Sequence, residues 1–137
     1  MTDSGPDVVA GVDVVRELAK RFGEGDRDGA MELYHPDVRI ELPSSLPHGG
    51  VYEGREGIAP MAAAFAEHWE RTIVDPRLLG CGDEVVQVTT QTWTAHSTGR
   101  SATVDVVELF TITDGMVSEI RVFQQDTHRL LQTLDPT

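Results

Sequence analysis

Two runs rich in β-branched and aromatic residues flank the dipeptide Asp114-Gly115, and this arrangement constrains the fold more than any other part of the chain. Together the runs span residues 103–126. Asp-Gly between apolar runs is the strongest short signal for a two-residue hairpin turn. If these two residues form the loop, Thr113 pairs with Met116, and the same count fixes every pair further along. The sequence therefore predicts one long antiparallel hairpin.

That register places Glu108 opposite Arg121, near the middle of the hairpin. Because side chains alternate between the two faces of a strand, the pair shares its face with four other residues. These are Val106, Phe110, Glu119 and Phe123. A largely apolar face with one acid and one base at its centre is typical of a ligand pocket. A cross-strand Glu and Arg pair is also an ordinary sheet-stabilising contact worth roughly 0.2–1 kcal/mol, and the sequence leaves both interpretations open.

Length and charge limit what the protein does. A chain of 137 residues is expected to form one domain over residues 1–137. Asp and Glu number 23 against 11 Lys and Arg, and a net charge of −12 argues against nucleic acid or an anionic membrane as partner. The single cysteine, Cys81, excludes an internal disulfide, and no segment resembles a signal peptide or a membrane span. We therefore expect a soluble cytoplasmic protein.

The remaining pattern predicts an α+β domain. Apolar residues at three- and four-residue steps indicate a helix over residues 8–22, a shorter one between Asp26 and His35, and a third over 58–69. Strands are expected at 38–42, 72–79 and 84–96, before the hairpin. Pro76 is expected to interrupt its strand or to place it at a sheet edge. This order favours helices packed on one face of a strongly curved, mainly antiparallel sheet.

Two segments of the chain resemble a known superfamily. The stretch from Gly25 to Asp37, followed by a strand, is similar to the opening of nuclear transport factor 2-like proteins. The segment from Asp114 to Phe123, with Asp126 after it, resembles their last strand. Within that superfamily the chain looks most like the SnoaL-like and ketosteroid isomerase-like proteins, over about residues 8–134.

The resemblance implies a cone-shaped α+β barrel in which a curved, mixed sheet wraps around three helices and encloses a pocket. It also implies a homodimer formed through the outer face of the sheet. It does not imply one activity, since this fold hosts isomerases, cyclases, hydrolases and plain binding modules.

Residue by residue, the catalytic groups of these relatives are mostly absent. The aspartate base of the ketosteroid isomerases corresponds to Leu42, and their oxyanion-binding tyrosine corresponds to Leu18. Their protonated aspartate corresponds to Glu108, which keeps a carboxyl group. The acid/base aspartate of the SnoaL cyclases corresponds to about Val122. The resemblance therefore supports neither a steroid isomerase reaction nor direct transfer of the cyclase mechanism.

Glu108 and Arg121 are the predicted catalytic pair. Burial in an apolar cone raises the pKa of a carboxyl group, whereas a neighbouring Arg lowers it, and the sequence does not decide which effect is larger. Arg121 could instead bind a substrate carboxylate. Glu119 is either a second carboxylate of the site or a solvated charge at its mouth.

Further predicted binding residues come from the other elements. A two-residue turn at Thr98-Gly99 would place Gln91 and Trp93 on the pocket face opposite Val106 and Val104, although residues 97–100 could form a longer loop. The other candidates are Phe65 and Trp69 on the third helix, Tyr34, and His48 in the loop spanning 43–54, which we expect at the pocket rim. Packing is the alternative role of the aromatic residues among them.

The sequence contains no nucleotide-binding glycine motif and no metal-ligand spacing, so we expect neither cofactor nor metal. The leading hypothesis is a cofactor-independent cyclase, isomerase or hydrolase that acts on a lipophilic polyketide- or terpenoid-like molecule. The main alternative is a non-catalytic ligand-binding or dimerisation module of the same fold. A protein-trafficking adaptor is a third hypothesis that rests on the fold alone.

Overall fold

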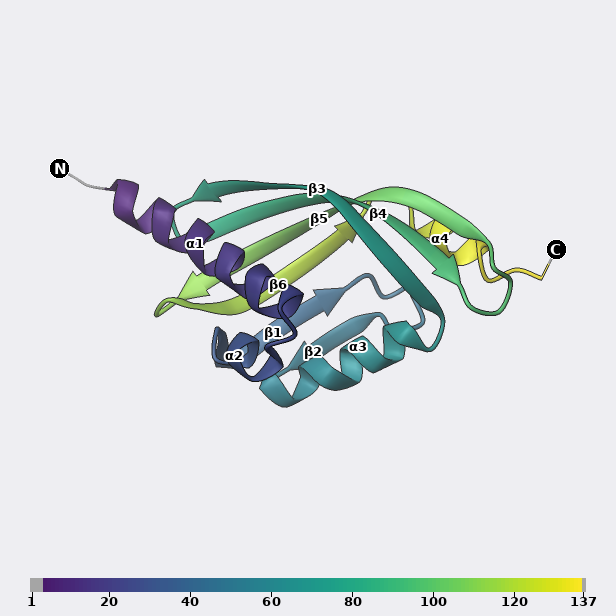
Figure 1. Cartoon of the computed structure of the whole chain (residues 1–137), viewed down its shortest axis with the longest axis horizontal. Coiled ribbons are helices and arrows are strands. Elements are labelled where there is room, and N and C mark those ends of the chain that lie inside the picture. The colour runs from purple at the N-terminus through teal and green to yellow at the C-terminus, as the bar shows by residue number, and fades with distance from the viewer. Residues whose placement is uncertain (1–3, 137) are drawn as a thin grey trace.

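A computed structural model describes residues 4–136 as a curved six-stranded sheet with helices packed on one side (Figure 1). In chain order the elements are α1 (Ser4–Gly23), α2 (Arg27–Met31), β1 (Tyr34–Leu42), β2 (Gly50–Glu53), the 3-10 turn η1 (Arg55–Gly57), α3 (Ile58–Ala66), β3 (Trp69–Cys81), β4 (Glu84–Ala95), β5 (Ser101–Thr113), β6 (Met116–Gln124) and α4 (Thr127–Gln132). The predicted α+β class, with a cone-shaped curved sheet, is confirmed.

The sheet order is β2-β1-β6-β5-β4-β3, and only the β1 and β6 pair is parallel. We call the side that faces α1, α2 and α3 the concave face, and the opposite side the convex face (Figure 1). α4 lies at the far end of the sheet from the start of α1. None of the helices within residues 4–136 is long and apolar enough to cross a membrane.

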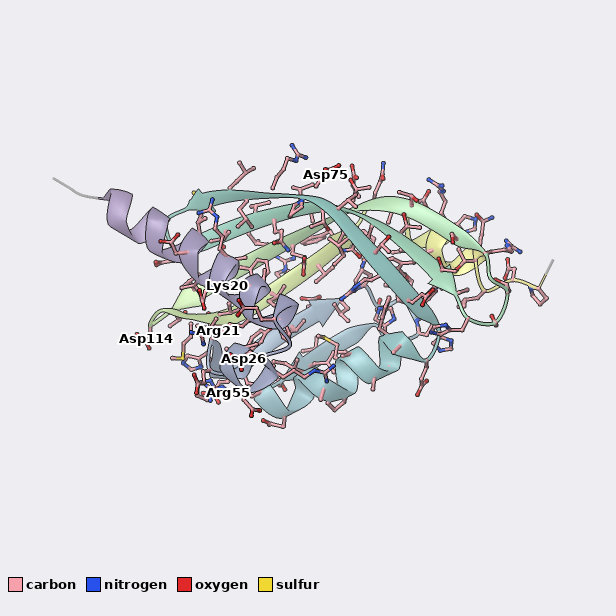
Figure 2. All side chains as sticks on the ribbon, viewed as in Figure 1. Lys20, Arg21, Asp26, Arg55, Asp75 and Asp114 are labelled. Carbon is pink, nitrogen blue, oxygen red and sulfur yellow. The ribbon has the colours of Figure 1, made fainter. Side chains whose placement is uncertain are left out.

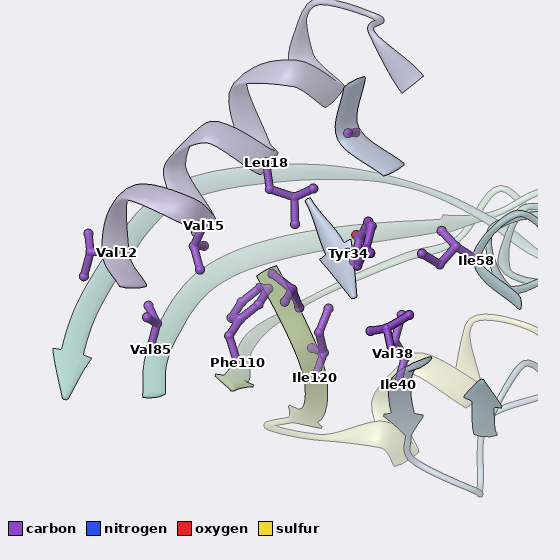
Figure 3. Packing of buried hydrophobic residues seen from close by; sticks show 12 residues of the cluster. Val12, Val15, Leu18, Tyr34, Val38, Ile40, Ile58, Val85, Phe110 and Ile120 are labelled. Atoms are coloured by element: carbon purple, nitrogen blue, oxygen red, sulfur yellow. The ribbon is translucent and has the colours of Figure 1, made fainter. Parts of the chain in front are cut away.

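One hydrophobic cluster lies between α1 and the concave face (Figure 3). Val12, Val15 and Leu18 follow one another at helical spacing and are all less than 10% exposed. They pack in the same cluster as Phe110 and Ile120 of the last two strands. A second cluster, which includes Trp69, Trp93 and Leu130, fills the other end of the sheet near α4.

Two arginines fix the start of β1. Arg21, in the last turn of α1, donates from Nη1 to the Gly29 carbonyl at 2.7 Å, and thereby joins α1 to α2. Arg55 donates from Nε to the Tyr34 carbonyl at 2.7 Å. Figure 2 shows both arginines at the same end of the molecule, close to Asp26, which caps α2. These contacts position Tyr34 on the concave side.

Several predicted boundaries differ from the structure. The second helix ends at Met31 and β1 already begins at Tyr34, with Pro36 inside the strand. Part of the predicted loop 43–54 forms the short edge strand β2. The third helix ends at Ala66, so Trp69 belongs to β3. The expectation for Pro76 is confirmed, because β3 is an edge strand whose register shifts between Val74 and Arg77.

The hairpin begins as predicted and then departs from the predicted register. Asp114 and Gly115 have φ values of 55° and 73°, as a two-residue turn of this kind requires, and Thr113 pairs with Met116. Beyond this start Thr111 pairs with Glu119, so Ser118 is an extra residue in β6. The Ser118 hydroxyl donates to the Thr111 carbonyl at 3.1 Å. Ser118 therefore forms a β-bulge that shifts every later pair by one residue.

The bulge makes the predicted pairing of Glu108 with Arg121 wrong. Glu108 pairs with Val122, and Arg121 pairs with Leu109. A shift of one residue exchanges the two faces of a strand. Glu119, Arg121 and Phe123 consequently lie on the convex face, and Ile120 and Val122 lie on the concave face.

The preceding turn also differs from the two-residue prediction but leaves the faces unchanged. Gln91 pairs with Val104 and Trp93 pairs with Ala102, which is the longer-loop alternative. This shift of two residues restores the same alternation. Gln91 and Trp93 therefore remain on the concave face, 4% and 1% exposed.

A pair of substitutions tests the register of β6. Ile120→Ala removes a side chain that is 6% exposed and should lower the free energy of unfolding by roughly 2–4 kcal/mol. Phe123→Ala, at a position 47% exposed, should lower it by less than about 1 kcal/mol in the monomer. Urea denaturation in dilute solution measures both values. The opposite ranking would contradict the bulge and restore the predicted register.

Candidate active site

Glu108 lies on the concave face of β5, beside Gln87 of β4. The two residues are direct cross-strand partners, and Gln87 Nε2 donates to Glu108 Oε1 at 2.9 Å. Burial raises the pKa of the Glu108 carboxyl above its ordinary value, while the hydrogen bond from Gln87 and the charge of Arg71 act in the opposite direction. The net direction is upward, so Glu108 is an acid whose surroundings favour its neutral form.

The cation whose charge lowers the pKa of Glu108 is Arg71 of β3, and not Arg121. Arg71 is the cross-strand partner of Trp93 and therefore points to the concave side. Its guanidinium carbon lies 4.7 Å from the centre of the Phe65 ring, a cation–π contact. The side chain is exposed to solvent, yet the protein atoms packed around it disfavour its charged form and lower its pKa. The negative charge of Glu108 acts in the opposite direction and raises the pKa of Arg71. This combination is expected of a charged side chain on the inner wall of a curved sheet.

Four rings pack together beside Arg71. Ring centres lie 4.8 Å apart for Phe65 and Trp93, 5.1 Å for Trp69 and Trp93, and 5.3 Å for His48 and Phe65. We call these four residues the aromatic cluster. Their contacts come from β3, β4, α3 and the loop before β2, so the cluster joins elements that are distant in the sequence.

Both indole N–H groups of the cluster are satisfied. Trp69 Nε1 donates to Thr133 Oγ1, just after α4, at 2.7 Å. Trp93 Nε1 donates to Gln91 Oε1 at 2.8 Å, and Gln91 Nε2 donates in turn to Thr89 Oγ1 at 3.0 Å. These bonds hold the two indoles in fixed orientations.

His48 is buried in the aromatic cluster with an unsatisfied ring nitrogen. The residue is 5% exposed, and Nδ1 is buried without a hydrogen-bond partner in the described part of the chain. Burial, together with the smaller effects of the charges of Arg71 and His68, lowers the pKa of His48 to about 4. The imidazole is therefore neutral at neutral pH.

Tyr34 and Phe110 complete the apolar surroundings of Glu108. They are 5% and 4% exposed and belong to the cluster beneath α1. Burial raises the pKa of the Tyr34 phenol, and the negative charge of Glu108 raises it further. Tyr34 therefore stays protonated and lies within electrostatic range of the acid.

The structure places eight of the predicted site residues on the concave side, in two groups, and moves three to the convex face. Eight lie on the concave side or in the aromatic cluster, namely Tyr34, His48, Phe65, Trp69, Gln91, Trp93, Glu108 and Phe110. Glu119 instead accepts from Arg39 at 3.1 Å, Arg121 lies 3.9 Å from Glu41, and Phe123 is exposed beneath Arg121. These three corrections all follow from the Ser118 bulge.

Sequence reasoning missed Arg71 and Gln87. Arg71 is two residues after Trp69, so alternation would have placed both on one face had the strand been started at Trp69. Gln87 shares the odd-numbered face of β4 with Gln91 and Trp93. Helical spacing assigned Trp69 to the third helix instead, and this boundary error concealed Arg71.

A hollow in the surface lies apart from Glu108 and is lined mainly by other residues. It has a volume of about 520 Å³ and lies at the β3 register shift, where Asp75, Pro76 and Arg77 face Thr90 and Asp105. Figure 2 shows Asp75 at the edge of the molecule away from α2 and α3. Thr89 also lines it, whereas Glu108, Gln87 and Arg71 do not. No group of three or more potential metal ligands occurs among the described residues.

The curved mixed sheet with its concave-side helices defines the class of nuclear transport factor 2-like proteins. The family model described as the SnoaL-like domain matches residues 15–120, and the chain belongs to that family. No match is found among curated proteins.

Solved structures share this fold over nearly the whole chain. A nuclear transport factor 2-like protein from Burkholderia xenovorans superposes with a TM-score of 0.84 at 24% identity, covering 93% of this chain and 98% of its own. TerC, crystallised with polyporic acid, gives 0.80 at 25% identity and covers 90% and 97%. A protein from Xanthomonas campestris, provisionally named a polyketide cyclase, gives 0.77 at 15% identity and covers 94% and 99%.

His48 predicts a loss of stability in acid. The pKa of this residue is about 4 in the folded protein, against an ordinary value of about 6.5, so the unfolded chain binds the proton more readily. The contribution of neutral His48 to the free energy of unfolding is complete above about pH 6.5. As pH falls towards 4 this free energy decreases, by roughly 3 kcal/mol in total. Urea denaturation across this range should show that loss.

The variant His48→Phe should remove this part of the pH dependence, since it has no proton to bind. His128→Phe, at an exposed position of α4, is the matched control and should leave the dependence unchanged. A pH profile that is identical in wild type and His48→Phe would refute the assignment.

Proposed function

We propose that the protein is a cofactor-independent enzyme that performs acid/base chemistry on a lipophilic small molecule of the polyketide or terpenoid kind. The supporting observation is Glu108, a carboxyl group with a raised pKa that lies on an apolar concave face. A carboxyl whose pKa moves towards neutrality is suited both to accept and to donate a proton near pH 7. Glu108 is the proposed general acid/base.

The surrounding groups suggest how such a step would proceed. Gln87 holds Oε1 of Glu108, which leaves Oε2 to accept a proton from an acidic C–H group. The electron pair of that bond moves into the adjacent carbonyl and forms an enolate, and the positive charge of Arg71 stabilises the developing negative charge. Glu108 then returns the proton to another atom of the substrate. Isomerisation, cyclisation and elimination all use such an exchange.

The family and its structural neighbours support a small-molecule role. TerC was crystallised with polyporic acid, and the Xanthomonas protein is provisionally named a polyketide cyclase. Val122, which corresponds approximately to the cyclase aspartate, is the cross-strand partner of Glu108. A carboxyl group from β5 would thus serve the same part of the concave face.

A non-catalytic ligand-binding module is the second candidate. Leu18, at the position of the isomerase tyrosine, is 5% exposed within the cluster under α1, and Leu42 packs against that same cluster. Two positions that carry catalytic groups in the isomerases therefore contribute only packing here. Binding without turnover would leave Glu108 as a ligand contact.

Deuterium exchange tests the proposed chemistry without knowledge of the natural substrate. Lipophilic β-keto esters in D₂O exchange their acidic C–H protons, and proton NMR follows the rate. The wild type should accelerate exchange, and Glu108→Gln should lower the enzymatic rate by about 100-fold or more, because the variant has no base.

The matched control is Glu119→Gln, which removes a carboxylate from the convex face and should leave the rate unchanged. Carbon NMR titration of the Glu108 carboxyl should also place its pKa above the ordinary range of glutamate. Exchange that persists in Glu108→Gln would exclude Glu108 as the base. Binding with no exchange in the wild type would favour the binding module.

We also propose that the protein forms a homodimer through the convex face. Phe123, Val74 and Leu79 on this face are 47%, 51% and 61% exposed, and Val107 and Leu109 lie half-buried among them. The ion pairs of Arg39 with Glu41 and Glu119 lie on the same face. An exposed apolar area beside charged groups is typical of a subunit interface.

Phe123→Glu should convert the dimer to a monomer, because it places an unpaired charge in the interface. Sedimentation velocity measures the change. Phe22→Glu is the matched control, since Phe22 is 42% exposed but lies on α1, away from the convex face. A wild type that is monomeric at every soluble concentration, or equal effects of the two variants, would contradict this dimer.

A further inference from the structure

Arg71 is a charged side chain on the concave face with no polar partner in the protein. Among the described side chains, residues 11–136, it forms no hydrogen bond and no ion pair within 4.0 Å. Arg39, by comparison, contacts both Glu41 and Glu119. The Arg71 guanidinium lies over the face of the Phe65 ring. All five of its N–H donors are therefore available.

Glu108 does not neutralise this charge. Its negative charge raises the pKa of Arg71, but the Glu108 carboxylate accepts its hydrogen bond from Gln87. The same surroundings that raise the pKa of Glu108 favour its uncharged form. When Glu108 is neutral, the concave face retains one uncompensated positive charge. An anion bound there would restore the balance without displacing any existing ion pair.

The neighbours of Arg71 define the rest of the ligand. Phe65 holds one face of the guanidinium and is partly exposed, whereas Trp69 and Trp93, which pack against Phe65, are each 1% exposed. Two parallel N–H donors of the guanidinium match the two oxygens of a carboxylate. Any other pair of ligand oxygens at a similar spacing can accept the same two hydrogen bonds. Apolar surface next to such a pair of donors suits a molecule with an acidic end and a flat apolar body.

We propose that Arg71 is the anion-binding residue of the site and that the substrate is an apolar, ring-containing acid, bound through a carboxylate or an ionised enol. This inference rests on the proposed function and makes the substrate class narrower. The anion lies on Arg71, and the apolar body lies against Phe65 at the edge of the aromatic cluster.

A matched pair of probes tests the charge preference directly. Naphthalene-2-carboxylate and naphthalene-2-carboxamide share one ring system and differ in charge. The chain has two tryptophans, both in the aromatic cluster, so their indole N–H signals in nitrogen–proton NMR spectra report binding at this place. The wild type should bind the carboxylate more tightly than the amide. Arg71→Gln should weaken carboxylate binding by about 10-fold or more and amide binding by less than about 2-fold.

Three further variants separate charge from structure. Arg121→Gln removes an arginine from the convex face and should change neither affinity. Arg71→Lys keeps the charge and should retain part of the preference for the carboxylate. Glu108→Gln removes the nearby acid and should strengthen carboxylate binding or leave it unchanged. The preference in the wild type should fall as salt concentration rises.

Equal losses for the two probes in Arg71→Gln, or no loss for either, would overturn the proposal. If Arg71→Gln disturbs the indole signals of the free protein, Arg71→Lys and the salt series decide, and a preference independent of salt overturns it. The outcome is distinguishable from that of the deuterium exchange assay. Anion preference without exchange describes a binding protein for acids, and exchange without anion preference describes an enzyme with a neutral substrate.

Discussion

The one-residue bulge at Ser118 determines which side chains of β6 face the helices. It places Ile120 in the cluster under α1 and sends Arg121 to the opposite face. Without the extra residue, Arg121 would stand beside Glu108 and hold its carboxyl ionised by direct pairing. With it, Glu108 has an amide partner, Gln87, and a more distant cation. The acidity of the site therefore depends on the backbone of a neighbouring strand.

The sequence was sufficient for the fold class and for most of the order of the elements, because apolar spacing and turn residues are local signals. It failed at the hairpin register, since Asp114-Gly115 specifies the turn but not a bulge four residues away. The error at the β4 to β5 turn was harmless, because a shift of two residues preserves the faces. Arg71 was missed because Trp69 fits helical spacing as well as the start of a strand.

Polar groups on the concave face occur on alternate residues of β4. Gln87 bonds to Glu108, and Thr89, Gln91 and Trp93 form a continuous row of hydrogen bonds. Each of these groups is satisfied within the sheet, so a largely apolar surface can include them at modest cost. His48 and Gln124 are the described residues in which a buried side-chain atom lacks a partner. The hydrogen bonds from Gln87 to Glu108 and along β4 are therefore formed, whereas one buried atom in each of His48 and Gln124 lacks a partner.

The hydrogen bond from Trp69 to Thr133 joins residues 64 positions apart. Thr98 of the β4 to β5 loop also donates to the Thr133 carbonyl. The aromatic cluster is thus assembled from the start of β3, a loop and the segment after α4. Contacts of such long sequence separation form only after the intervening chain has been ordered, because the entropy of loop closure must first be overcome. The aromatic cluster is consequently a property of the completed domain, and a local fragment of the sheet does not form it.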